Sequence, residues 1–453
     1  MPKGKWPVCA GHVATFVLCL ISIFTVLSPQ SAQAIPAFAE QTDQPCSSCH
    51  VGSFGPALTP MGRLFKLNGY VWDSGETGVP KVSAMLQGYL THTEKGQDGG
   101  AAPHFASNDN PSLDQASIFY GGKILDHLGA FVQTTYDGIA RRFAWDNVDV
   151  RYADTANFGD VSAVLGVSVN NNPTVQDLWN STPAWGTPFS APGLAPAPAA
   201  APVIAGGFAQ QVLGSSVYAM WDDWLYTEFG VYGNLSDRTQ TILGVSPMGE
   251  NRINGLAPYW RAAAQHQFGS HYVSLGTFGL SANVFPGQDR SAGTDRATDL
   301  GLDATYDYLG DEDNNFSIYA SFINEHQNLG ASSVLSGTNG SNTLRSANLT
   351  AAYTYLQTYT FSLGYFDIWG STDLGLYGGD SFNGSPNSNG INAEIDYTPF
   401  GKDDAPFGHH VNLRLGLQYT DYMKFNGARS NYDGAGRNAS DNNTVAAFAW
   451  FMF

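Results

Sequence analysis

The amino-acid sequence predicts an all-β fold, a transmembrane antiparallel β-barrel of about sixteen strands. Apolar and polar residues alternate with a period of two from about residue 82 onward, and long and short connections alternate between these segments. Charged residues make up only 13% of the chain, about half the share in soluble domains. Aromatic residues also make up 13% and glycine numbers 51, which suits aromatic girdles and loops. A large periplasmic β-sandwich or a solenoid is the alternative.

The alternation is clearest in four segments, 147–152, 300–308, 391–397 and 411–419. In the first of them, valine and tyrosine fall on one face and Asn, Asp and Arg fall on the other. In a barrel the polar face lines the lumen and the apolar face contacts lipid.

The predicted strands are 82–91, 115–124, 128–136, 145–153, 161–170, 210–221, 223–233, 257–268, 271–283, 298–308, 316–324, 347–356, 359–368, 390–398, 410–420 and 443–453. The predicted long connections are 92–114, 137–144, 171–209, 234–256, 284–297, 325–346, 369–389 and 421–442. Outer-membrane barrels have long extracellular loops and short periplasmic turns. We therefore expect every long connection to lie outside the cell, including the proline-rich stretch 183–207.

The last predicted strand ends in an aromatic residue, Phe453, with Phe451, Ala449, Ala447 and Val445 on the same face. A terminal aromatic residue on a final amphipathic strand is typical of bacterial outer-membrane barrels. This feature supports the barrel prediction when it is combined with the alternation.

Residues 1–34 have the three parts of a secretory signal peptide. Lys3 and Lys5 precede an apolar run from Val13 to Leu27, and the small residues of Ala32-Gln33-Ala34 follow. A retained membrane anchor is the alternative. Removal of the leader leaves 19 basic and 39 acidic residues, a net charge of −20, which excludes nucleic acid as an expected partner.

The sequence Cys46-Ser47-Ser48-Cys49-His50 has the C-x-x-C-H spacing of a c-type haem attachment site. Two thiols at this spacing form thioethers to the haem vinyl groups, and the imidazole becomes an axial ligand of the iron. A disulfide or half of a zinc site is the alternative, although no second cysteine pair completes a zinc site. We therefore predict three parts: a signal peptide (1–34), a monohaem cytochrome c segment (35–78) and an outer-membrane barrel (79–453).

The flanks of this motif carry a resemblance to a known family. Phe38-Ala39-Glu40-Gln41-Thr42 precedes the motif, and the tail runs from Pro56-Ala57-Leu58 through Gly62-Arg63-Leu64-Phe65-Lys66 to Gly69-Tyr70. The chain resembles the fused monohaem cytochrome–porin family of iron-oxidising bacteria. The resemblance implies a barrel of sixteen strands, haem c held by Cys46, Cys49 and His50, and electron transfer across the outer membrane from Fe(II).

The sequence does not assign the residue that supplies the sixth ligand of the haem iron. Met61 is one candidate, and His/Met ligation would raise the reduction potential. The alternative is that Met61 only packs against the edge of the haem. Met61 also stands where the family more often has Phe. Arg63 and Lys66 are candidate partners of the haem propionates, or solvated cations. The histidines expected near the periplasmic rim are further candidates: His127, His266, His271, His409 and His410.

The predicted function is an outer-membrane electron conduit. The haem segment plugs the barrel, an extracellular donor such as Fe(II) gives an electron, and a periplasmic cytochrome or other carrier collects it. No catalytic triad is present in the sequence, so any enzyme activity would be that of an Fe(II):cytochrome c oxidoreductase. The alternatives are a diffusion porin or transporter gated by the haem segment, and a soluble periplasmic cytochrome on a β-sandwich.

Overall fold

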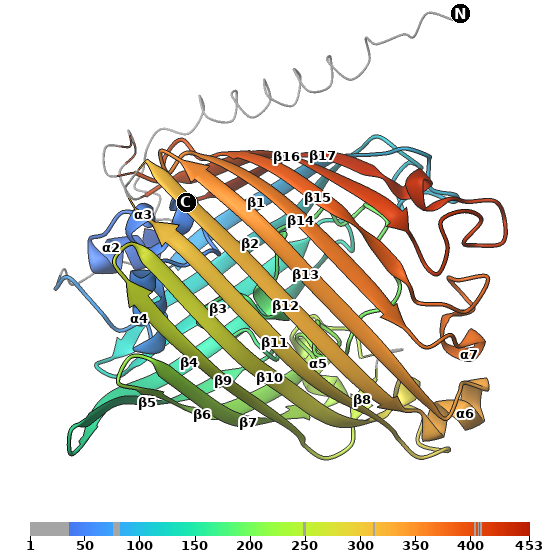
Figure 1. Ribbon diagram of the computed structural model, residues 1–453, viewed down its shortest axis with the longest axis horizontal. Coiled ribbons are helices and arrows are strands. Elements are labelled where there is room, and N and C mark those ends of the chain that lie inside the picture. Colours follow the sequence, from blue (N-terminus) through green and yellow to red (C-terminus); the bar gives the residue numbers. More distant parts are fainter. Residues whose placement is uncertain are drawn as a thin grey trace, which may run out of the picture.

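The computed structural model describes residues 36–75, 82–247, 251–310, 313–402, 405, 407 and 410–453. The predicted signal peptide, the predicted boundary at residue 78 and His409 lie outside the described residues. The described chain forms one closed antiparallel sheet, in which each strand of the wall pairs with the next wall strand in sequence and the last strand pairs with the first (Figure 1).

The sheet has seventeen strands, and one of them, β8 (Arg252–Ile253), is only two residues long. The sixteen strands that form the barrel wall are β1 (Val82–Thr93), β2 (Asn110–Leu125), β3 (Leu128–Asp137), β4 (Arg142–Phe158), β5 (Val161–Asn170), β6 (Val212–Trp221), β7 (Leu225–Asn234), β9 (Ala257–Phe268), β10 (His271–Phe285), β11 (Asp295–Leu309), β12 (Asn314–Asn328), β13 (Ser341–Tyr355), β14 (Tyr359–Gly370), β15 (Ser388–Tyr397), β16 (Asn412–Lys424) and β17 (Thr444–Met452). The predicted barrel of about sixteen strands is confirmed.

Several strands extend further than predicted at the end that carries the long loops. Strand β2 begins at Asn110 rather than 115, and β13 begins at Ser341 rather than 347. The β2 extension keeps the alternation, with Asn110, Ser112 and Asp114 inward and Pro111 and Leu113 outward, whereas the β13 extension is mostly polar on both faces. The backbone ladder continues there because interstrand hydrogen bonds do not require apolar side chains.

Seven long connections of the described chain lie at one end of the barrel, opposite the C-terminus, whereas the connection between β15 and β16, residues 398–411, lies at the other end. The seven are 94–109, 171–211, 235–256, 286–294, 329–340, 371–387 and 425–443. The predicted long connection 137–144 is wrong, because β4 begins at Arg142 and leaves a turn of only 138–141. Short helices occupy several of these connections: η2 (Pro183–Trp185), α5 (Asp237–Ile242), η3 (Pro286–Gln288), α6 (Gly330–Ser336), α7 (Leu374–Tyr377) and η4 (Ala439–Asn442).

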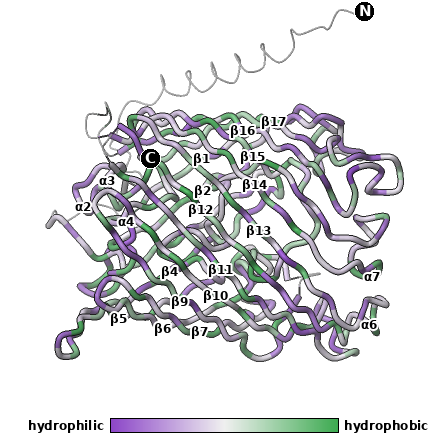
Figure 2. Tube along the Cα trace, in the orientation of Figure 1, coloured by the Kyte–Doolittle hydropathy of each residue, from purple (hydrophilic) through white to green (hydrophobic). Residues whose placement is uncertain are grey.

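The two faces of the wall differ in the way the alternation predicts. On β11, Asp299, Asp303 and Asp307 are buried in the lumen, whereas Leu300 and Leu302 on the outer face are 52% and 55% exposed. Figure 2 shows the same alternation of hydrophilic and hydrophobic residues along the strands. A closed barrel with an exposed apolar outer face is stable only where lipid covers that face. The chain is an outer-membrane β-barrel, and none of its described helices has the length and apolarity to span a bilayer.

Residues 36–75 form a segment of short helices that we call the N-terminal segment. Its helices are α2 (Pro36–Thr42), α3 (Cys46–Cys49), η1 (Val51–Ser53) and α4 (Pro60–Leu67). The segment lies within the lumen, because the Tyr70 hydroxyl donates to Asp149 on the inner face of β4 at 2.7 Å. The hydroxyl of Tyr218 on β6 donates to the Leu67 carbonyl at 2.8 Å.

The N-terminal segment lies at the end of the barrel that has the short turns. The Gly52 amide donates to the Gln357 side chain in the β13–β14 turn at 2.8 Å, and the Ser47 amide donates to the Gly401 carbonyl at 3.2 Å. Figure 1 places α3 beside the C-terminus and α6 and α7 at the opposite end. With short turns facing the periplasm, the segment plugs the periplasmic mouth.

The connection 171–211, which we call the luminal loop, folds into the barrel. Asp177 and Trp179 are fully buried, and the Asn180 side chain donates to the Pro56 carbonyl of the N-terminal segment. The expectation that every long connection lies outside is therefore wrong for this loop. Its polar side chains find partners on the luminal wall, which makes the buried position favourable.

Candidate cofactor site

A cavity of about 740 Å³ separates the N-terminal segment from the barrel wall. The segment contributes Cys46, Cys49 and His50 to its lining. The opposite side consists of inward-facing residues of β1–β4 and β17 and of residues 184–193 of the luminal loop. The structure thus places the three residues of the C-x-x-C-H motif together at one cavity.

The motif is held by a compact local fold. Cys46 and Cys49 lie one helical turn apart on α3, and the His50 amide donates to the Cys46 carbonyl at 2.8 Å. The chain then turns back and forms a bridge between His50 and Leu58. A side chain at Gly62 would collide with the Cys49 carbonyl, so glycine is required where α4 crosses α3.

The two thiols are unbonded and neutral. Cys46 and Cys49 do not form a disulfide. Burial raises the pKa of the Cys46 thiol to about 11, and burial together with the neighbouring Cys46 raises the pKa of Cys49 to about 11. A reactive or metal-binding cysteine has a lowered thiol pKa, so this environment does not suit a nucleophile. No group of three or more His, Cys, Asp or Glu side chains is placed to hold a metal ion within the described ranges.

His50 is half-buried, and its imidazole packs against Gly55. Burial lowers the pKa of His50 to about 4, which keeps the ring neutral at physiological pH. Its Nδ1 atom is buried without a hydrogen-bond partner among the described residues. A neutral, incompletely satisfied imidazole on a cavity is the chemistry that a haem iron ligand requires.

One part of the wall that faces the motif is apolar, whereas the rest of the cavity lining on β1–β4 is mostly polar or charged. Met85 on β1, Phe119 on β2 and Met452 on β17 form a buried cluster with Phe54 of the N-terminal segment. Trp450 stands edge-on to Phe54 with ring centroids 5.1 Å apart. The sequence indicated this apolar patch, because the inner face of β17 has Phe448, Trp450 and Met452, whereas the inner face of β11 has aspartates. An apolar patch of this kind suits the face of a porphyrin.

The other predicted site residues lie away from the cavity or already have partners. Met61 and Arg63 are not among the lining residues. Arg63 forms an ion pair with Asp307 on β11 and lies over the Tyr272 ring at 4.1 Å. Lys66 lines the cavity, but its Nζ atom donates to the carbonyls of the luminal loop at Val175 (2.9 Å) and Asp177 (2.6 Å).

The candidate histidines stay at the rim. His127 contacts the Ala153 carbonyl at 3.2 Å, and His271 contacts the Tyr306 hydroxyl at 2.9 Å. His266 stacks beside Phe268, and the exposed His410 pairs with Glu40 at 2.6 Å. Of the histidines that the structure describes, only His50 lines the cavity.

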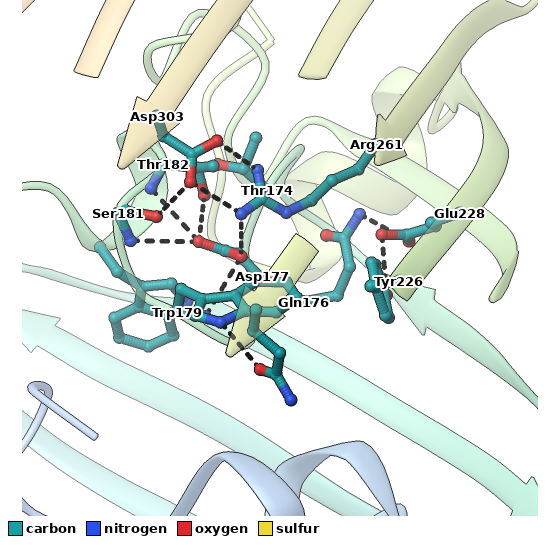
Figure 3. Close-up of polar contacts among 12 residues, drawn as sticks. Thr174, Gln176, Asp177, Trp179, Ser181, Thr182, Tyr226, Glu228, Arg261 and Asp303 are labelled. Atoms are coloured by element: carbon teal, nitrogen blue, oxygen red, sulfur yellow. Dashed lines mark hydrogen bonds and ion pairs between the residues drawn. The ribbon is translucent and has the colours of Figure 1, made fainter. Parts of the chain in front are cut away.

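A buried network of ion pairs fixes the luminal loop against the wall (Figure 3). The Arg261 guanidinium on β9 donates to Asp177 of the loop and to Asp303 of β11, each at 2.9 Å. The Ser181 hydroxyl also donates to Asp303, at 2.6 Å. Charges of both signs are therefore paired where the loop meets the barrel, which offsets their desolvation.

The cavity extends from the motif toward the end with the long loops. Its lining includes Asp137, Ile139 and Arg142, which lie at or beside the β3–β4 turn at that end. One cavity therefore runs from the N-terminal segment to the β3–β4 turn, which lies level with the middle of β2 because Asp137 pairs with Gln115. This continuity was not predicted from the sequence, because it depends on how the luminal loop packs.

Comparisons with known proteins find similarity at the level of solved structures. No protein-family model matches the sequence, and no curated protein matches it. The chain is similar to the outer-membrane channel DcaP of Acinetobacter baumannii, with 11% identity over 82% of this chain and 96% of the other and a TM-score of 0.44. It is also similar to the anion-selective porin of Comamonas acidovorans, with 13% identity, 82% and 98% coverage and a TM-score of 0.44.

Proposed function

We propose that this outer-membrane barrel carries one haem c in its lumen and passes electrons between an extracellular donor, Fe(II), and a periplasmic carrier. The observation that carries the proposal is the cavity that Cys46, Cys49 and His50 share with the apolar cluster of Met85, Phe119 and Met452. The family resemblance in the flanks of the motif supports the same assignment.

The residues present fit a c-type haem. Two neutral thiols lie one helical turn apart, a neutral imidazole follows, and all three line a cavity of about 740 Å³. Cys46 and Cys49 would hold the macrocycle through thioethers, and His50 would bind the iron. The bound group supplies one-electron exchange. The chain's own residues would line the site, and the bonds of Tyr70 and Leu67 to the wall hold the segment in the lumen.

The position of the site suits transfer between the two sides of the membrane. The N-terminal segment lies at the periplasmic mouth, and the cavity continues to the outer end of β3 and β4. The predicted net charge of −20 for the chain without its leader favours cationic donors and basic carriers.

A second candidate function is a diffusion porin or transporter in which the N-terminal segment acts as a gate or plug. The sixteen-strand barrel supports this reading more directly than it supports electron transfer, since barrels of this size enclose an aqueous channel. The luminal loop narrows the lumen, as a size filter would. This function needs no electron to reach the motif.

Sealed proteoliposomes with the long loops outward, loaded with an oxidised soluble cytochrome, separate the two functions. Membrane-impermeant Fe(II) is added outside, and the absorption of both haem groups is followed. The conduit predicts reduction of the barrel haem and then of the trapped cytochrome. The matched control is the double variant Cys46→Ala/Cys49→Ala, which should transfer nothing. Passage of small solutes with no haem reduction would instead establish the porin.

A further inference from the structure

Two methionines stand side by side on the wall that faces the motif. Met85 on β1 and Met452 on β17 are direct cross-strand neighbours, and both line the cavity that also contains His50. They are 3% and 9% exposed, and both pack in the cluster with Phe54 and Phe119. Neither residue belongs to the segment that carries the motif.

The placement of these thioethers bears on the sixth ligand of a haem iron. His50 reaches the iron from the N-terminal segment, so a ligand on the opposite face of the macrocycle comes most directly from the opposite side of the cavity. Thioethers are established axial ligands of c-type haem. The described lining of the cavity holds no second histidine.

The remaining candidates on the N-terminal segment are less suitable. Met61 does not line the cavity. Lys66 lines it, but the Nζ atom is already directed to the two carbonyls of Val175 and Asp177. A ligand from the wall therefore requires less rearrangement than a ligand from α4.

Met85 is the more deeply buried of the two, with 3% of its surface exposed against 9% for Met452. Both methionines lie on strands that are paired on both sides, Met85 between β17 and β2 and Met452 between β1 and β16. The wall therefore holds each of them in one orientation, as a ligand of the iron requires. Deeper burial favours Met85 as the ligand, and Met452 serves as its matched control.

We propose that the thioether of Met85, on the barrel wall, is the distal ligand of the haem iron. This inference rests on the proposed haem. It makes the cofactor a link between two parts of the fold, bound covalently to α3 and through the iron to β1. It also gives the iron His/Met ligation, which raises the reduction potential relative to ligation by two imidazoles and suits an acceptor of electrons from Fe(II).

The test compares three leucine variants of the full-length protein, Met85→Leu, Met452→Leu and Met61→Leu. Leucine preserves volume and apolarity, so folding of the barrel is expected to continue. Haem content is measured on a denaturing gel, and ligation is measured by the far-red absorption band of ferric Met-ligated haem and by carbon monoxide binding to the ferrous form. Met85→Leu should keep its haem, lose the band, bind carbon monoxide and have a lower potential.

The two controls and one further variant decide the assignment. Met452→Leu and Met61→Leu should keep the band and the potential of the wild type. Met85→His should remain six-coordinate with a lowered potential, which a purely structural role for Met85 does not predict. Loss of the band in either control, or its retention in Met85→Leu, would overturn the inference while leaving the haem in place. Absence of haem from the wild-type protein would overturn the proposed function as well.

Discussion

At the scale of single residues, Lys66 is a basic residue in an unusual, buried environment. Burial lowers the pKa of Lys66 from 10.5 to about 7, and repulsion by Arg151 adds to this effect. A neutral amine has two N–H groups, which matches the two carbonyls that its Nζ contacts. The residue can therefore hold the luminal loop to α4 without a charge.

This lowered pKa predicts a pH dependence of stability. Between pH 7 and 10.5, Lys66 in the unfolded chain binds a proton that the folded chain does not bind, so the free energy of unfolding rises with pH in this range. The slope is about 1.4 kcal/mol per pH unit for one proton. Below pH 7 both forms are protonated and this contribution stops changing. The variant Lys66→Met removes the dependence.

The measurement is urea unfolding of the protein in detergent at several pH values. Other groups titrate in the same range, so the quantity to compare is the difference between the wild type and Lys66→Met. That difference should rise from pH 7 toward pH 10. A difference that is independent of pH would show that Lys66 keeps its proton in the folded lumen.

Single residues also show what the sequence could and could not predict about the site. Cys46, Cys49 and His50 could be named as candidates from their local spacing, and the structure places all three at one cavity. Met85 and Trp450 could not, because they belong to the site only after β1 and β17 have closed the barrel. The expectation that Met61 approaches the iron relied on nearness in sequence, whereas the fold places this residue outside the lining.

At the scale of elements, the luminal loop depends on the ion pairs of Arg261. Replacement of this residue by methionine would leave Asp177 and Asp303 buried without their shared cation. Loss of one partner from a buried ion pair costs about 3–5 kcal/mol. We expect Arg261→Met to release the loop, and limited proteolysis should then cleave within 171–211.

The matched control for this variant is Arg252→Met. Arg252 pairs with Asp237 in an exposed connection at the same end of the barrel, and such a pair contributes about 1 kcal/mol or less. In Arg252→Met, the luminal loop should remain as resistant to proteolysis as it is in the wild type. Equal protection of the luminal loop in both variants would mean that contacts other than Arg261 hold it in the lumen.

The elements also mark the limit of pattern-based prediction. The sixteen strands follow from period-two alternation, which is a property of each segment. The inward fold of 171–211 follows from contacts with β9 and β11, between residues more than eighty positions apart such as Asp177 and Arg261. A loop pattern of proline and small residues is the same whether the loop faces water or the lumen.

At the scale of the whole molecule, two inward-folded parts share one lumen. The N-terminal segment closes the periplasmic mouth, and the luminal loop lies above it, joined to it by the bonds of Lys66 and Asn180. A sixteen-strand barrel without such parts leaves an aqueous channel. We therefore expect the amount of polypeptide in the lumen, rather than the barrel itself, to determine whether the protein conducts ions.

Deletion of residues 36–75 from the mature chain should convert the barrel into an open pore. The deletion removes the contacts that hold the luminal loop from below, so conductance in planar bilayers should rise severalfold above that of the full-length protein. The control Cys46→Ala/Cys49→Ala keeps the segment and should conduct as poorly as the wild type, because polypeptide and not cofactor closes the mouth. Equal conductance of the deletion variant and the full-length protein would contradict this prediction. If both conductances are low, the luminal loop closes the lumen alone. If both are high, the intact protein is already a porin.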